Sequence, residues 1–292
     1  MTLVLLAGTL FGTAGTALAL APDDTPAISA ATLRLLVGGI ALTGVAAVLG
    51  ARRPPRRAIA PMVGGALGVA AYQSLFFTAT TSTGVAVATL ATIGVSPLAS
   101  RLIGRFRGRP APHRVWWLAA LLLLLGLVVL VAAGYGNLRV NPAGVAAAVG
   151  AGIAYAWYAE CGSIAISVGA DSTPVMASLF LGGGVVLGPS LAVTDNSWVF
   201  SGRGALVLTY ISLVTLTVAY VAFGRGLSVL EPTTVVMLTV SEPVVASVAS
   251  AVVLDENLRP GGWIGAAVVM AGLPLVAVAE RRRVRPVPEP PG

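Results

Sequence analysis

Two charged residues lie inside long apolar stretches of the chain, where charges are rare: Arg34 and Glu242. A charge at the centre of a membrane-spanning helix costs about 2.5 to 3.5 kcal/mol on insertion scales, so it should face the protein interior and have a partner. Glu242 could bind a proton or a substrate ammonium group, with Arg34 as its partner through a hydroxyl or a water molecule. A structural ion pair, or a protonated and hydrogen-bonded carboxyl, is the alternative.

Aromatic residues with a polar tip occur in the same kind of stretch. Tyr155 and Tyr158 are three residues apart and so share one face of a helix, while Gln73 follows Tyr72 and Tyr220 stands further along. Such side chains suit an amphipathic organic solute. We expect these five residues to line a substrate cavity with Glu242 and Arg34; ordinary packing or interface anchoring is the alternative for each tyrosine.

Two prolines, Pro97 and Pro243, stand near the middle of apolar stretches. A proline removes one helical hydrogen bond and crowds the carbonyl four residues earlier. The carbonyls of Ile93 and Thr239 are therefore expected to be free as ligands or as parts of a hinge. We predict paired hinges, with a static kink satisfied by neighbouring helices as the alternative.

The sequence lacks the residues that several kinds of catalytic and metal-binding site require. Cys161 is the single cysteine and His113 the single histidine, so a His/Cys metal site and a Ser-His-Asp triad are excluded. No Gly-Lys-Ser/Thr sequence exists for a phosphate-binding loop. We expect no metal, no cofactor and no ATP-driven transport. Asp255 with Glu256 is interpreted as a solvated helix-end cluster, and Glu160 as less informative because it lies at a helix end.

The composition requires a lipid environment for these residues. Of 292 residues, 57 % are hydrophobic and 10 % charged, against roughly 25 % charged in ordinary soluble proteins. The chain shows ten continuous apolar stretches of about membrane-spanning length, and continuity favours helices over a barrel. These stretches are Thr2–Leu20, Ala27–Leu49, Ala58–Ala79, Val85–Ile103, Val115–Ala133, Pro142–Ala159, Pro174–Val193, Ala205–Phe223, Thr233–Leu254 and Gly262–Ala279.

Two segments allow a second interpretation. The first stretch ends in a sequence typical of signal-peptide cleavage, but no basic residue precedes it, so we expect a retained helix. The run Thr78 to Thr83 contains five hydroxyl residues before Gly84, and we expect it to form the turn between the third and fourth helices.

The basic residues indicate the orientation. All 18 are arginines and the net charge is +7, but they lie between apolar runs, which argues against nucleic-acid binding. With ten spans, fourteen arginines fall on the side of both termini and three, Arg139, Arg203 and Arg259, on the other. Since positive loops stay inside, we expect both termini in the cytoplasm.

A weak internal repeat divides the chain in two. Asp23 and Asp171, and Tyr72 and Tyr220, are 148 residues apart, whereas Pro97 and Pro243 are 146 apart. Units of five helices, an odd number, would be inserted in opposite orientations, which is typical of secondary transporters. We predict an all-α polytopic membrane protein of two inverted five-helix repeats. The expected boundaries are residues 1–133, residues 134–280 and a basic, then proline-rich, cytoplasmic tail at 281–292.

The chain resembles the EamA-type transporters of the drug/metabolite transporter superfamily over nearly its whole length. The resemblance rests on Thr25-Pro26 followed by Arg34, on Ser96-Pro97 and Glu242-Pro243, and on Leu254-Asp255-Glu256-Asn257-Leu258 leading into Trp263, Gly265 and Gly272. It implies a ten-helix inner-membrane carrier, often an exporter of amino acids or other small metabolites.

The sequence therefore predicts a secondary transporter, and not an enzyme, that exports a small organic metabolite such as an amino acid by alternating access. Its expected partners are the small-molecule substrate, the lipid bilayer and, as a candidate coupling ion, the proton. The alternatives are an importer or passive facilitator, an integral-membrane lipid-modifying enzyme, and a structural scaffold. The scaffold gives no reason for charges at Arg34 and Glu242.

Overall fold

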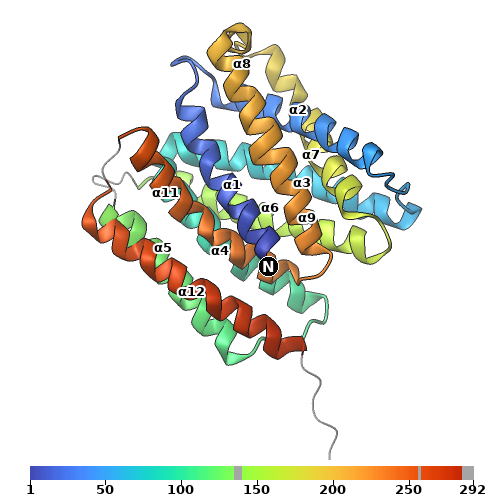
Figure 1. Cartoon of the computed structure of the whole chain (residues 1–292), viewed down its shortest axis with the longest axis vertical. Coiled ribbons are helices and arrows are strands. Elements are labelled where there is room, and N and C mark those ends of the chain that lie inside the picture. Colours follow the sequence, from blue (N-terminus) through green and yellow to red (C-terminus); the bar gives the residue numbers. More distant parts are fainter. Residues whose placement is uncertain (135–139, 256–257, 285–292) are drawn as a thin grey trace, which may run out of the picture.

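The structure is a computed structural model that describes residues 1–134, 140–255 and 258–284. Within these ranges the chain forms helices and no strand, which confirms the predicted all-α class (Figure 1). The first half contains α1 (Thr2–Ala19), α2 (Ala27–Val48), α3 (Arg56–Thr83), α4 (Val85–Phe106) and α5 (Arg114–Gly134). The second half contains α6 (Pro142–Ser167), α7 (Ser172–Leu187), η1 (Gly188–Ala192), η2 (Ser197–Phe200), α8 (Gly202–Thr209), η3 (Tyr210–Val218), α9 (Ala219–Leu227), α10 (Pro232–Leu238), η4 (Thr239–Ser241), α11 (Glu242–Val253) and α12 (Pro260–Val284).

Nine segments of the described chain are long and apolar enough to cross a membrane. Three of them combine short elements: α7 with η1, α8 with η3 and α9, and α10 with η4 and α11. Helix α6 is 26 residues long but is not among the nine. It packs against α3 and α4 and buries polar side chains among them, so less of its surface has to be apolar. Ten spans therefore stay a prediction.

Helices of the two halves pack against each other in matching pairs. Helix α2 packs on α7 and α5 on α12; α4 packs on α6 and α1 on α11; α3 packs on α6 and α1 on α9. Each pair has a counterpart when the halves are exchanged. Figure 1 shows α5 and α12 side by side at one edge of the bundle.

Both described chain ends lie at the same end of the bundle. Val4 of α1 lies against Gly226 at the end of α9. Val235 of α10 lies near the same glycine. Its neighbour Thr234 donates a hydrogen bond at 2.6 Å to the carboxylate of Glu280, near the end of α12. We call this end the terminus side. Residues 135–139, 256–257 and 285–292, which include Arg139, Glu256 and most of the expected tail, lie outside the described residues.

Helix α1 packs inside the bundle, with Val4 and Ala7 fully buried; its retention stays a prediction. The expected limit of the third helix has a clear outcome. The turn predicted at Thr78 to Thr83 is wrong, because α3 continues through Thr83 and only Gly84, with φ of 83°, ends it. The hydroxyls of this run bond back to their own helix, as Thr78 does to the Ser74 carbonyl, which lets polar residues extend a helix.

Glycine permits the close approach of α2 and α7. A Cβ at Gly39 would lie 2.6 Å from the backbone nitrogen and Cα of Leu181, whereas a Cβ at Gly44 in the same helix would meet nothing within 4 Å. Close backbone contact of this kind is how helices associate in lipid, where the hydrophobic effect does not drive them together.

We expect Gly39→Ala to lower the free energy of unfolding by about 1 to 3 kcal/mol, as overpacking does, because the Leu181 backbone cannot move aside alone. Gly44→Ala is the matched control and should leave stability unchanged or raise it by up to about 1 kcal/mol, the helix-propensity gain. Unfolding of the purified protein in detergent, followed by tryptophan fluorescence, measures both. Equal midpoints for Gly39→Ala and the unchanged protein would contradict the close contact.

Candidate functional site

A cavity of about 1040 Å³ lies between the helices of the two halves. Its inner part reaches Tyr155 and Tyr158 in the middle of the bundle. Its outer part is lined by exposed residues at the end opposite the terminus side, among them Ala19, Val85 and Arg259, so the cavity opens at that end. Small-molecule sites usually occupy about 300 to 1,000 Å³. All seven residues expected to bind substrate line it: Arg34, Tyr72, Gln73, Tyr155, Tyr158, Tyr220 and Glu242.

Arg34 is held by a π-helix. In η3 the backbone hydrogen bonds run to the fifth residue instead of the fourth, a geometry that is rare and frequent at functional sites. The Arg34 Nε donates to the Ile211 carbonyl at 3.1 Å and Nη2 to the Thr215 carbonyl at 3.0 Å. Hydroxyls support this turn, since Thr217 donates to the Ser212 carbonyl five residues earlier. Among the described residues Nη1 has no hydrogen-bond partner, which leaves it available to a ligand.

Glu242 stands at a break in its helix. Helix α10 ends at Leu238, the 3₁₀ turn η4 follows, and α11 begins at Glu242 with Pro243 in its first turn. Since the first turn of a helix carries partial positive charge, a carboxylate is stabilised there. Within the described residues the Glu242 carboxyl makes no hydrogen bond or ion pair. The expected partnership with Arg34 is therefore not a direct one, because the guanidinium binds backbone carbonyls instead.

The tyrosines form the inner wall of the cavity. The hydroxyl of Tyr158 lies 3.0 Å from that of Tyr220, and the hydroxyl of Tyr155 lies 2.7 Å from Thr239 Oγ1 in η4. The ring centroids of Tyr72 and Tyr155 are 5.9 Å apart. Phe11 and Phe180 extend this wall, with centroids 4.8 and 3.8 Å from that of Tyr220. The wall thus combines aromatic faces with hydroxyls that bind one another.

The two prolines have different surroundings. Pro243 accompanies the interruption of its span and lines the large cavity. Pro97 lies inside α4, which runs without a break from Val85 to Phe106, and lines a separate apolar pocket of about 190 Å³ that also touches α5. The two prolines occupy corresponding positions in the two halves, but the helix is continuous at Pro97 and interrupted at Pro243. The hinge role of both stays a prediction.

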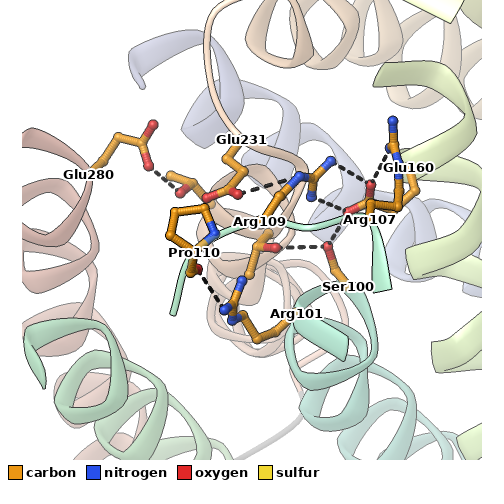
Figure 2. A network of polar contacts seen from close by, with 10 residues as sticks. Ser100, Arg101, Arg107, Arg109, Pro110, Glu160, Glu231 and Glu280 are labelled. Carbon is orange, nitrogen blue, oxygen red and sulfur yellow. Dashed lines mark hydrogen bonds and ion pairs between the residues drawn. The ribbon is translucent and has the colours of Figure 1, made fainter. Parts of the chain in front are cut away.

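A polar network on the terminus side was not expected from the sequence (Figure 2). Its centre is Glu160, 1 % exposed, whose two carboxylate oxygens each accept a 2.7 Å bond from Arg109. The span around Glu160 was expected to end at Ala159, but α6 runs on to Ser167, which places the carboxylate inside a helix. A charge between Ala159 and Cys161 was the signal that could have identified it.

The described residues contain no group of three or more His, Cys, Asp or Glu side chains that could hold a metal ion.

The loop around Asp195 lies outside the spans. The backbone N–H and then the hydroxyl of Ser197 donate hydrogen bonds to Asp195 and hold the pKa of that carboxyl below its usual range. The same loop is fastened to α2, because Ser29 donates to Asn196 and accepts from the Trp198 indole.

The chain is similar to known proteins over nearly its whole length. The EamA-like transporter family matches residues 1–132 and 142–278. Two uncharacterized transporters of Bacillus subtilis (strain 168) are related: YwfM is 33 % identical over 281 residues, 96 % of this chain and 94 % of its own length. YdeK is 26 % identical over 266 residues, 90 % of each chain. A crystal structure of 19 % identity has the same fold, with a TM-score of 0.82 over 97 % of this chain and 98 % of the other.

Proposed function

Because this chain belongs to the EamA-like transporter family, part of the drug/metabolite transporter superfamily, we propose that it is a secondary transporter of a small organic metabolite such as an amino acid. The observation that carries this proposal is the cavity that brings Arg34 and Glu242 into one space open at one end. A zwitterionic metabolite offers a carboxylate to the guanidinium and an ammonium group to the carboxyl. The aromatic wall suits its apolar part.

We further propose that the chain has ten spans, with α6 as the sixth, arranged as inverted repeats of residues 1–133 and 134–280. Two observations support this arrangement. The family matches two segments of similar length, and the packing pairs of the helices have counterparts when the halves are exchanged. Alternating access then follows if the halves rock about a site between them, with Pro97 and Pro243 as hinges.

The proposed setting is the cell membrane, with the terminus side in the cytoplasm, as the distribution of arginines suggests. The cavity then opens outward. Export is proposed on family resemblance; import or passive facilitation are the alternatives in the same class. Family membership also supports a transporter over a lipid-modifying enzyme. Protons are the proposed coupling ion, with Glu242 as the group that binds them.

Transport by the purified protein in proteoliposomes tests the proposal. Radiolabelled amino acids and other small zwitterions are loaded, and counterflow is measured with and without a proton gradient. We expect at least one zwitterion to be exchanged, faster than in liposomes that contain a Glu242→Gln, Arg34→Gln double variant. Exchange of neutral sugars alone, equally fast in that variant, would refute the zwitterion site.

A further inference from the structure

The cavity has a closed end as well as an open one. Toward the terminus side it stops at the aromatic wall of Tyr155, Tyr158 and Tyr220. Glu160 follows Tyr158 on the same helix, toward the terminus side, and is the centre of the network in Figure 2. A substrate that passes between the cavity and the terminus side has to pass this region, so the network stands in a position to control access.

The network joins the two halves of the chain. Ser100 of α4 donates to Glu160 Oε1 at 3.0 Å, and its hydroxyl is 3.1 Å from that of Thr233 in α10. Arg107 Nη1 reaches Glu160 Oε2 at 3.1 Å. Arg109 also reaches the Glu231 carboxylate, with 3.5 Å between Nε and Oε1. Ser100 and both arginines belong to the first half, and their partners belong to the second.

Glycine places Arg109 in this position. Gly108 takes a φ of 77° after the end of α4, a left-handed conformation that glycine adopts readily and that commonly ends helices. The chain then turns back, and the Arg109 N–H donates to the Gly104 carbonyl at 2.9 Å. A Cβ at Gly104 would lie 3.2 Å from Arg109 Cδ, so the arginine stem lies directly over that glycine.

The opposite end of the bundle has no matching charge at the equivalent position. The spacing of 148 residues relates Glu160 to Gly12, which lines the open cavity and lies against the break before α11, where a Cβ would be 2.7 Å from the Glu242 carbonyl oxygen. The spacing of 146 relates Arg109 to Asp255. The closed end thus has a glutamate and an arginine, Glu160 and Arg109, where the open end has a glycine and an aspartate.

We propose that Glu160, Arg107 and Arg109, with Glu231, form a gate that closes the cavity on the cytoplasmic side, and that transport requires this gate to open. This inference rests on the proposed alternating access. An ion pair suits a gate because the desolvation cost of a buried pair offsets much of its attraction. When water enters between the halves, both charges become hydrated and the open state is not strongly disfavoured.

Thiol labelling from each side of the membrane tests the gate without any substrate. The reporter is Ala246→Cys, one turn from Glu242 and on the cavity wall, in a Cys161→Ala background. In oriented vesicles we expect a charged maleimide to label it from outside and slowly from the cytoplasmic side. Adding Glu160→Gln with Arg109→Gln should raise cytoplasmic labelling by on the order of tenfold, a shift in a two-state equilibrium.

The matched control is Arg105→Gln, because Arg105 is exposed in the same segment. This variant should leave both labelling rates unchanged.

A second variant keeps the charges of the network and locks the two halves together. Ser100→Cys combined with Thr233→Cys should form a disulfide on oxidation. We expect the oxidised protein to lose cytoplasmic labelling, retain outside labelling and recover on reduction. Cytoplasmic labelling that neither variant changes would overturn the gate. Changed labelling in a protein that exchanges no zwitterion would refute the proposed substrate while the gate stands.

Discussion

Glu242→Gln is expected to reduce transport by about 10- to 100-fold, the equivalent of losing one hydrogen bond to a charged group, about 1.5 to 3 kcal/mol. The side chain keeps its size and its place in the first turn of α11, so only the charge and the ionisable proton are removed. If this carboxyl exchanges the coupling proton, transport by the unchanged protein varies with pH and the residual transport of the variant does not.

Stability separates this effect from misfolding. The carboxyl has no ion-pair partner among the described residues, and a charge within the bilayer is costly, so Glu242→Gln should unfold at the same temperature or higher. Asp24→Asn is the control, because Asp24 is exposed outside the spans and should change neither transport nor stability. A Glu242→Gln protein that transports as fast as the unchanged protein at every pH, with the same pH dependence, would eliminate the proton site. A lowered unfolding temperature would mean that the carboxylate is structural.

Arg34→Gln is expected to lower the free energy of unfolding by about 2 to 4 kcal/mol, because it removes two charge-assisted hydrogen bonds to carbonyls inside the bundle. The carbonyls of Ile211 and Thr215 would then lose the donors that Arg34 supplies to the π-helix. Arg34→Lys keeps the charge but not the planar fork that reaches both oxygens, so it should recover only part of the stability. Transport should fall in both variants.

The control is Arg225→Gln, since Arg225 is exposed at the end of α9 in the same span. Thermal unfolding in detergent measures all three variants, and counterflow measures their transport. An Arg34→Gln protein as stable as the unchanged one would show that the guanidinium does not support η3. The opposite stability effects expected at Glu242 and Arg34 distinguish a residue kept for its ligand from one that also holds the fold.

Short motifs spread along the chain, such as Ser96-Pro97 and Glu242-Pro243, were enough to indicate the family, and the family match confirms it. The helical class was equally accessible, because long apolar runs leave the backbone few alternatives in lipid. That Arg34, Tyr72 and Glu242 share one cavity was expected from their charge, polarity and depth in apolar runs, and the structure places all three there. Their roles in transport remain predictions.

The partners of those residues were not accessible in the same way. Arg34 was expected to face Glu242, but its guanidinium donates hydrogen bonds to backbone carbonyls of a π-helix. No local sequence pattern in Tyr210 to Val218 predicts a π-helix. Glu160 looks like a helix-end charge in the sequence because the apolar stretch before it ends at Ala159, whereas the helix itself continues for eight more residues to Ser167. An error of two turns changed a buried carboxylate at the centre of a network into an apparent helix-end charge.

Transfer free energies belong to each residue and its neighbours, so the order of residues is enough to show which segments are apolar enough to span a membrane and which charges are too costly there to be incidental. What those charges touch depends on how the helices are arranged in three dimensions. Ser100, Arg109, Glu160 and Thr233 come from segments far apart in the chain, and their contact depends on how whole helices pack. That packing is what leaves the cavity open at one end and closed at the other.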